Sequence, residues 1–170
     1  WSSVKIKTLK LQTPEEAEIT KLATNSWIDL NIAFANEIAR TIDHLKFDVD
    51  IMNVIKAANT LKKGSSFINI LLPSLGVGGY CLTKDPIFLN REKSKKEKYS
   101  LILEARKINN DMPEYCARRI LNVISKRKIK NQKMLILGAT YKGNTDDIRE
   151  TPVFKFIKVL KKNKFKNIFI

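Results

Sequence analysis

The sequence is poor in cysteine and contains no long apolar run. Two cysteines among 170 residues are too few for a disulfide framework, and they do not point to an oxidising compartment. No apolar stretch approaches the ~20 residues that a membrane-spanning helix needs, and no basic-then-apolar signal segment opens the chain. The single histidine, His44, has no second His or Cys at a metal-ligand spacing, so we expect it at the surface and predict no metal site. These absences favour a globular cytoplasmic protein.

Acidic side chains are also scarce, with 17 Asp and Glu residues against 32 Lys and Arg residues and a net charge of +15. This surplus fits either a nucleic-acid-binding module or the Lys-rich surface of an enzyme that handles anionic ligands. Zinc-finger spacing, a basic zipper and an aromatic-rich RNA-binding strand motif are all missing from the sequence. Nucleic-acid binding is therefore kept only as the less favoured alternative.

One long helix dominates the first quarter of the sequence. It follows Val4–Leu11, where alternating side chains predict a half-buried strand. Thr13 is placed as the N-cap, with Pro14 in the first turn, and the helix is expected over residues 15–40. Its apolar side chains recur at spacings of three, four and seven residues: Ile19, Leu22, Ala23, Leu30, Ala33, Phe34 and Ile38. A helix of this length usually crosses another domain or a partner subunit.

The middle of the chain is typical of short helices joined by loops. Helices are predicted over residues 48–60, 99–111 and 113–128, with a glycine-rich loop over residues 65–80. Pro113 suits the first turn of the last of these helices. Two further side chains are assigned to packing, Trp27 in the long helix and Cys116 in the last one.

The last 40 residues have a different character. An apolar run over residues 133–138 predicts a buried parallel strand, and a helix over 151–162 and a strand over 167–170 follow. A lone β-α-β unit cannot form a stable sheet, so we expect it to belong to a larger doubly wound domain. The predicted fold class is a mainly α domain, built on the long helix and a helical bundle, followed by the start of an α/β doubly wound domain. Because the chain opens on Trp1 rather than Met, we expect a piece of a longer protein.

The richest candidate site is a glycine-rich window over residues 73–86. Glycines let a backbone approach a ligand closely, and Cys81 follows them where a helix could begin. A helix N-terminus and Lys84 would both favour the nucleophilic thiolate, and Asp85 lies one turn further on. The alternative is a glycine-rich turn around a buried small residue.

Two further windows have less distinctive patterns. Lys21 and Asn25 lie one turn apart on the long helix, and by themselves they fit ordinary surface polarity. Residues 138–152 follow a parallel strand, where ligands bind in open α/β folds, and Lys142 and Arg149 there would suit phosphate. The alternative is a solvated connection whose Asp and Arg side chains pair with one another.

Taken together, the three windows resemble the nucleotide-sugar dehydrogenases, the family of UDP-glucose and UDP-N-acetylmannosamine 6-dehydrogenases. The family pattern E-A-E-x-x-K-x-x-x-N is matched by Glu16–Asn25, and G-x-G-G-x-C-x-x-K-D is matched by Gly76–Asp85. The pattern F-K-x-x-T-D-D-x-R-E-[ST]-P is matched by Tyr141–Pro152, with Tyr in place of Phe. The resemblance runs from about Pro14 to the end of the chain.

The resemblance implies an enzyme that oxidises the 6-hydroxymethyl group of a UDP-sugar to a carboxylate with two NAD⁺. It implies that Cys81 attacks the aldehyde, giving first a thiohemiacetal and then a thioester that water hydrolyses. Lys21 and Asn25 would stabilise the developing oxyanion and position water. Asp85 would support the lysine and the hydrolytic water.

Binding roles follow from the same resemblance. The loop at Gly78 and Gly79 would hold the substrate, with Ile70 packed near it. Tyr141 and Lys142 would contact the UDP-sugar. Two cations are placed near the NAD cofactor: Lys84 and Arg149. The long helix over 15–40 would form much of a homodimer interface.

On this resemblance the chain divides into three regions. Residues 1–12 would end an NAD-binding Rossmann domain that is otherwise missing, since its G-x-G-x-x-G turn is absent from the sequence. Residues 13–130 would be the central helical domain for dimerisation and catalysis, and residues 131–170 a truncated UDP-binding domain. The stretch over 62–67 lacks an arginine that many members carry before the glycine loop, so either a lysine substitutes or that contact is missing.

Two assignments within the family stay open. The G-V-G-G-Y-C wording, the Asp-Pro after Lys84 and the E-T-P at 150–152 favour UDP-N-acetyl-D-mannosamine as the substrate, in polysaccharide or glycan biosynthesis. Lys84 is shared with the UDP-glucose type. We expect the piece alone to be inactive, and the alternative is an inactive dimerisation remnant of the UDP-glucose dehydrogenase type.

Overall fold

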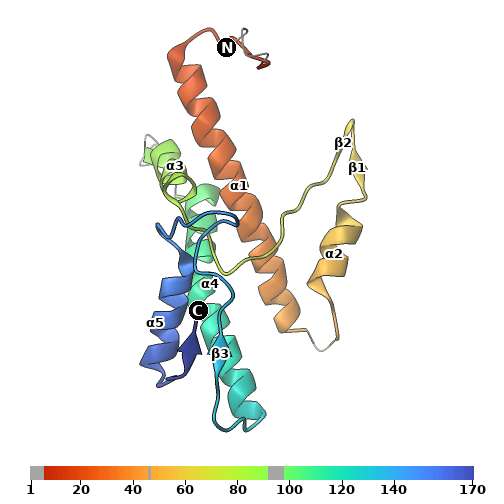
Figure 1. The fold of residues 1–170 in the computed structure, drawn as a ribbon. Helices are drawn as coiled ribbons and strands as arrows, with labels where there is room; N and C mark the ends of the chain where they lie inside the picture. Colours follow the sequence, from red (N-terminus) through yellow and green to blue (C-terminus); the bar gives the residue numbers. More distant parts are fainter. Residues whose placement is uncertain (1–5, 46, 92–97) are drawn as a thin grey trace.

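A 30-residue helix, α1 (Pro14–Asp43), runs through the molecule and packs against α2, α3 and α4. The computed structural model describes residues 6–45, 47–91 and 98–170. Figure 1 shows α3 (Tyr80–Arg91) and α4 (Leu101–Lys126) on one side of α1, and the arm that holds α2 (Ile51–Ala58) on the other. The remaining elements are β1 (Lys62–Lys63), β2 (Ser66–Phe67), β3 (Met134–Leu135), α5 (Pro152–Lys162) and β4 (Ile168–Phe169). A helical first part followed by a β-α-β unit confirms the predicted fold class.

The start of α1 follows directly from its sequence. Thr13 Oγ1 accepts a hydrogen bond from the Glu16 amide at 3.2 Å, and Glu16 Oε2 accepts one from the Thr13 amide at 3.2 Å. This reciprocal capping box satisfies amides that the first turn leaves without helical partners. The long helix is confirmed, and it extends three residues beyond the predicted end to Asp43.

The predicted apolar face of α1 is only partly buried, with Ala33 buried and Leu22, Leu30 and Ile38 half-buried. Ile19, Trp27 and Phe34, spaced by eight and seven residues along one face, are 57%, 62% and 49% exposed. Within this chain Trp27 is therefore largely uncovered, although the sequence predicted that it packs against a neighbour. The buried side chains of α1 are mostly polar or small: Asn25, Ser26, Asp29, Asn31, Ala33, Ala35 and Asn36. Polar side chains tolerate burial only with hydrogen-bond partners, and here other elements of the chain supply them.

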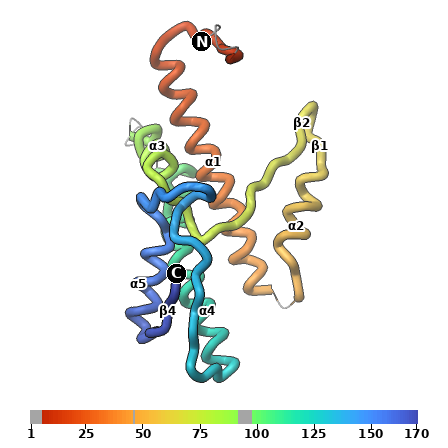
Figure 2. Tube along the Cα trace, in the orientation of Figure 1, coloured from red at the N-terminus to blue at the C-terminus, as the bar shows by residue number. Residues whose placement is uncertain are grey.

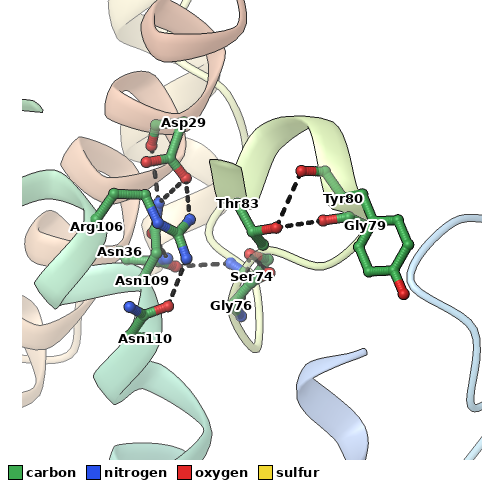
Figure 3. Close-up of polar contacts among 10 residues, drawn as sticks. All are labelled: Asp29, Asn36, Ser74, Gly76, Gly79, Tyr80, Thr83, Arg106, Asn109 and Asn110. Carbon is green, nitrogen blue, oxygen red and sulfur yellow. Dashed lines mark hydrogen bonds and ion pairs between the residues drawn. The ribbon is translucent and has the colours of Figure 1, made fainter. Parts of the chain in front are cut away.

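A buried ion pair joins α1 to α4 (Figure 3). Arg106 Nη1 donates to Asp29 Oδ1 at 2.5 Å, with the two side chains 6% and 1% exposed. Asn109 Nδ2 donates to the same carboxylate oxygen and to the Asp29 carbonyl, each at 2.8 Å. Burial raises the pKa of Asp29, while the charge of Arg106 and the bond from Asn109 offset part of the rise. Among the described residues, Asp29 Oδ2 and Arg106 Nε have no hydrogen-bond partner, so the pair depends on one carboxylate oxygen.

Residues 101–126 form one helix, α4, where the sequence predicts two. Pro113 lies inside this helix and is buried. Proline lacks the amide that would bond the carbonyl four residues earlier, which here belongs to Asn109. That carbonyl faces Gly76, where a Cβ would lie only 2.9 Å from it, and Lys155 donates to the next carbonyl, that of Asn110. Packing on both sides therefore carries the helix through the proline.

The β-α-β unit packs on α4 through one apolar cluster. Its buried members are Ala117, Phe156, Leu160 and Phe165, and Cys116 packs against them as predicted. The two strands pair in parallel as predicted, Met134 opposite Ile168 and Leu135 opposite Phe169. The predicted burial of the first strand is wrong, since Leu135 is 66% and Leu137 88% exposed. Alternate side chains of a strand point to opposite faces, and only one face of this sheet meets the helices.

Smaller differences concern the ends of the predicted elements. Residues 6–11 form no strand, and the first two residues of that predicted strand lie outside the described part of the chain. A strand exists only through hydrogen bonds to a neighbour, which alternation alone does not supply. The helix predicted over 48–60 starts later, because Asp50 Oδ1 accepts from the Met52 amide at 2.8 Å and caps α2. The predicted loop over 65–80 contains β2, which pairs with β1 in a short antiparallel hairpin.

We expect Asp29→Ala to lower the free energy of unfolding by about 3–5 kcal/mol, because it leaves the Arg106 charge buried without an opposite charge beside it. The matched control is Glu104→Ala, which breaks the exposed pair between Glu104 and Lys107. That change should cost no more than ~1 kcal/mol. Urea denaturation followed by circular dichroism measures both. Equal losses in the two variants would contradict the role assigned to the buried pair.

Candidate active site

The glycine loop, residues 76–79, lies against the segment over 141–150. Gly79 N donates to the carbonyl oxygen of Arg149 at 2.9 Å. Gly79 has a φ of +76°, and a Cβ on it would come within 2.8 Å of the Tyr141 ring. A Cβ on Gly78 would come within 2.5 Å of the Tyr141 Cβ. Both glycines are therefore required where the two segments meet.

Cys81 lies in the first turn of α3 and is exposed. Figure 3 shows how that turn is closed: Thr83 Oγ1 donates to the carbonyls of Gly79 at 2.7 Å and of Tyr80 at 3.2 Å. Cys116 is half-buried in α4, and burial raises the pKa of its thiol. The two cysteines differ in access to a reactant, and Cys81 is the accessible one.

Asn25 and Asp85 meet between α1 and α3. Asn25 Nδ2 donates to Asp85 Oδ2 at 2.5 Å across 60 residues of sequence, and Asn25 is 6% exposed. Asp85 lies one helical turn after Cys81, and Lys21 is exposed one turn before Asn25 on α1. The hydrogen bond thus brings the Lys21 and Asn25 pair of the long helix to the helix that carries the cysteine.

One tyrosine ring gathers two cations beside the loop. Lys84 Nζ lies 4.9 Å from the centroid of the Tyr80 ring, and the guanidinium carbon of Arg149 lies 5.0 Å from it. Asp147 accepts from Arg149 Nε at 2.8 Å and from Nη2 at 2.5 Å. These bonds lower the pKa of Asp147 to about 2 and raise that of Arg149. The Asp–Arg pairing weighed as an alternative for this segment is present, and so are two positive charges that suit phosphate.

The other predicted substrate contacts fall in two places. Tyr141 packs on the glycine loop, and Lys142 next to it is exposed. Ile70 is half-buried on the segment between β2 and α3. Its amide donates to Asn59 Oδ1 at 2.7 Å, and its carbonyl accepts from Asn59 Nδ2 at 2.9 Å. The structure brings Tyr141 to the loop and gives Ile70 a position set by the end of α2.

Two buried asparagines of α1 hold the segment between β2 and α3, which Figure 2 shows crossing α1. Asn31 accepts from the Leu71 amide at 2.8 Å and donates to the Asn69 carbonyl at 2.7 Å. Asn36 accepts from the Ser74 amide at 2.7 Å. Neither Asn31 nor Asn36 was predicted as a site residue from the sequence. Polar side chains that recur at helical spacing along α1 were the signal for a second, buried face.

A cavity of about 770 Å³ opens beside Tyr80 and Lys84, between α3, α4 and the start of α5. Apolar side chains form part of its wall, including Val77, Ile87 and Leu103. Its charged lining residues are Lys84, Arg106, Lys107, Lys155 and Glu150. Two of these cations are already in ion pairs, Arg106 with Asp29 and Lys107 with Glu104. The other two, Lys84 and Lys155, outnumber the Glu150 carboxylate and suit an anionic group.

Two other kinds of site find no support in the residues that the structure describes. Within residues 6–45, 47–91 and 98–170, no three His, Cys, Asp or Glu side chains are grouped so that they could bind a metal ion. None of the helices over the same ranges combines the length and apolar character that crossing a bilayer requires.

Family models match most of the chain. Residues 15–111 match the central domain of the UDP-glucose/GDP-mannose dehydrogenase family. Residues 135–169 match the UDP binding domain of the same family. Together the two matches cover all three of the windows singled out from the sequence.

Individual relatives agree with the family match. The chain is 42% identical over 147 residues to the UDP-N-acetyl-D-mannosamine dehydrogenase of Methanococcus maripaludis strain C7, covering 86% of this chain and 32% of the relative. The solved UDP-D-ManNAc dehydrogenase of Pyrococcus horikoshii superposes with a TM-score of 0.77 at 37% identity, covering 90% of this chain and 35% of that one. The UDP-N-acetyl-mannosamine dehydrogenase of Staphylococcus aureus gives a TM-score of 0.73 at 32% identity, covering 91% and 34%. The chain thus spans about a third of the length of these relatives.

We expect iodoacetamide to alkylate Cys81 at least roughly tenfold faster than Cys116 at pH 8, because the thiolate is the reacting form and burial disfavours it at Cys116. Mass spectrometry of the two cysteine peptides over time measures both rates. The control is the chain unfolded in urea, where the two rates should converge. Equal and slow rates in the folded chain would argue against an accessible nucleophile at Cys81.

Proposed function

Since the chain belongs to the UDP-glucose/GDP-mannose dehydrogenase family, we propose that it is the central part of an NAD-dependent UDP-sugar 6-dehydrogenase. The favoured substrate is UDP-N-acetyl-D-mannosamine, oxidised to UDP-N-acetyl-D-mannosaminuronate for polysaccharide or glycan biosynthesis. The names of the relatives support this choice of sugar. The single observation that carries the proposal is the hydrogen bond from Asn25 to Asp85, which sets an amide and a carboxylate one turn from Cys81.

Cys81 is the proposed nucleophile. Its thiolate sulfur bonds to the carbon of the C6 aldehyde, and the carbonyl oxygen takes up a proton to give a thiohemiacetal. That adduct loses the hydride from C6 and the proton of its hydroxyl group, which gives a thioester on Cys81. Water then attacks the thioester carbon, the C–S bond breaks, and the carboxylate leaves with the thiolate restored. The exposure of Cys81 supports a role in which the sulfur must meet a substrate from solvent.

Asn25, Lys21 and Asp85 are proposed to serve the oxyanion and the hydrolytic water. An amide N–H and an ammonium group on one helix face supply the donors that a negative oxygen needs. Asp85 accepts from Asn25 in the structure, which holds the amide in one orientation. A carboxylate in this place also balances the charge of Lys21 and accepts a proton from water.

The positive charges on the other side of the loop suit the cofactor. Lys84 and Arg149 are proposed to hold the phosphates of NAD⁺, and their shared position on Tyr80 supports that role. NAD⁺ supplies a hydride acceptor for both oxidation steps when it is bound. Lys84 and Arg149 bind and orient it without taking part in the hydride transfer.

The UDP-sugar is proposed to lie along the glycine loop. Gly78 and Gly79 bring the backbone close, Tyr141 and Lys142 contact the nucleotide sugar, and Ile70 packs nearby. The contact between Tyr141 and the two glycines supports this grouping. We keep the proposed regions: the end of an NAD-binding domain at 1–12, a central helical domain over 13–130 and the start of a UDP-binding domain over 131–170.

A second copy of the chain is the proposed partner of α1. The apolar side chains Ile19, Trp27 and Phe34 are all about half exposed or more, on the face that points away from α3 and α4. Exposed apolar stripes of this kind mark interaction surfaces. This observation favours homodimerisation through residues 15–40, whether the chain works as an enzyme or as a dimerising core.

Calorimetric titration of this chain with UDP-N-acetyl-D-mannosamine and UDP-glucose tests the substrate. We expect the first to bind roughly tenfold more tightly, the difference that one well-placed hydrogen bond makes. Lys142→Ala should weaken binding by about tenfold, because it removes a charged donor to the nucleotide sugar. The matched control is Lys128→Ala, on an exposed lysine outside the three windows, which should change nothing.

Cys81→Ser separates binding from chemistry in the full-length protein. UDP-sugar affinity should persist, while NADH formation should cease. Loss of affinity in Lys128→Ala as well as Lys142→Ala would indicate unspecific attraction to the basic surface instead. An active Cys81→Ser enzyme would contradict the covalent mechanism.

Light scattering at micromolar concentration tests the dimer. We expect the mass from light scattering to be that of a dimer for this chain and that of a monomer for Trp27→Asp. A buried unpaired carboxylate is strongly unfavourable at an apolar interface. Met52→Asp, on an exposed apolar side chain of α2, is the control and should leave the mass unchanged. A monomeric wild-type chain would rule out this interface.

A further inference from the structure

Tyr80 stands between the glycine loop and Cys81, yet neither the family patterns nor the proposed mechanism gives it a role. It is the first residue of α3 and is 46% exposed. Figure 3 shows its backbone tied into the turn by Thr83, and its ring extending away from α3. A large exposed ring next to a nucleophile calls for a physical explanation.

The ring contacts both cations that would face the cofactor. Lys84 follows Tyr80 by four residues on α3, so their side chains lie on the same helix face. Arg149 comes from the segment before α5, 69 positions further along the sequence. Their charged groups lie 4.9 Å and 5.0 Å from the ring centroid, within the range of a cation–π attraction.

Two like charges drawn to one ring repel each other, and the structure offsets that repulsion in two ways. The negative face of the aromatic ring attracts each cation. The Asp147 carboxylate neutralises part of the Arg149 charge through two hydrogen bonds. In the described part of the chain no carboxylate forms an ion pair with Lys84, whereas Arg149 is paired with Asp147, so the two cations together still present a net positive charge.

The backbone fixes the place where these groups meet. The Gly79 amide donates to the Arg149 carbonyl at 2.9 Å. Gly79 directly precedes Tyr80, and Arg149 is the residue whose guanidinium group lies over the Tyr80 ring. The first turn of α3 and the segment over 141–150 are therefore in register at this point. The ring of Tyr80 can therefore contact Lys84 from α3 and Arg149 from the segment before α5 at the same time.

We propose that Tyr80 is a positioning residue that holds Lys84 and Arg149 ready for the phosphates of the dinucleotide cofactor. It acts through these two cations and takes no part in the chemistry of Cys81. The inference rests on the proposed function for the identity of the ligand, whereas the placing of the two cations by the ring stands without it. Preorganised charges bind an anion more tightly because less side-chain freedom is lost on binding.

Nuclear magnetic resonance of this chain tests the positioning directly. The ring current of Tyr80 should shift the Lys84 ε-CH₂ and Arg149 δ-CH₂ protons upfield. Tyr80→Phe keeps the ring and should keep both shifts, whereas Tyr80→Leu, of similar bulk without a ring, should abolish both. Titration with inorganic pyrophosphate should perturb these two side chains and bind about fivefold more weakly in Tyr80→Leu, the size of one exposed cation–π contact. Absent upfield shifts in the wild-type chain, or equal pyrophosphate affinity in all three forms, would overturn the proposal.

Kinetics of the full-length protein test the link to the cofactor. Tyr80→Leu should raise the KM for NAD⁺ about fivefold and leave the KM for the UDP-sugar unchanged, and Tyr80→Phe should restore the wild-type value. An equal rise in both KM values would indicate a general structural role and overturn the proposal. If the wild-type protein binds no NAD⁺, the proposed function fails, and the spectroscopic and pyrophosphate results still decide whether Tyr80 positions the cations.

Discussion

The buried contact of Asp29 with Arg106 and Asn109 is the constraint on which the other features depend. A carboxylate and a guanidinium group inside a protein are stable only as partners, so this pair allows one arrangement of α1 against α4. Asn36 extends the network, donating to Asn109 at 2.9 Å and accepting from the Ser74 amide. The chain is thereby held two residues before the glycine loop begins.

That inward polar face has two consequences for function. It leaves the apolar side chains of α1, such as Trp27 and Phe34, on the outer surface, where a second copy could cover them. It also points Asn25 toward α3, where the amide reaches Asp85 next to the cysteine. A single helix therefore serves the proposed active site on one face and the proposed dimer on the other.

Much of this site could be predicted from local sequence. The spacing from Gly76 to Asp85 placed Cys81 at a helix start, and α3 begins at Tyr80. Glycines at 78 and 79 announced a close approach, and the structure identifies the approaching group as Tyr141. The proposed role of Tyr80 could not be predicted from local sequence, because one of the two cations on its ring is the distant residue Arg149. Pro113 predicted the start of a new helix, whereas packing against Gly76 and Lys155 keeps α4 continuous through it.

By itself the sequence determined where α1 begins and which side chains follow one another around Cys81. Capping at Thr13 and the order of residues around Cys81 act over a few residues, and such short-range effects can be read along the chain. Only the tertiary structure decided which face of α1 is inside. Both an apolar and a polar stripe follow the helical period, and hydrophobicity alone does not identify the polar stripe as buried. The choice lay with partners far away in sequence, because Arg106 and Asn109 make burial of the polar stripe favourable.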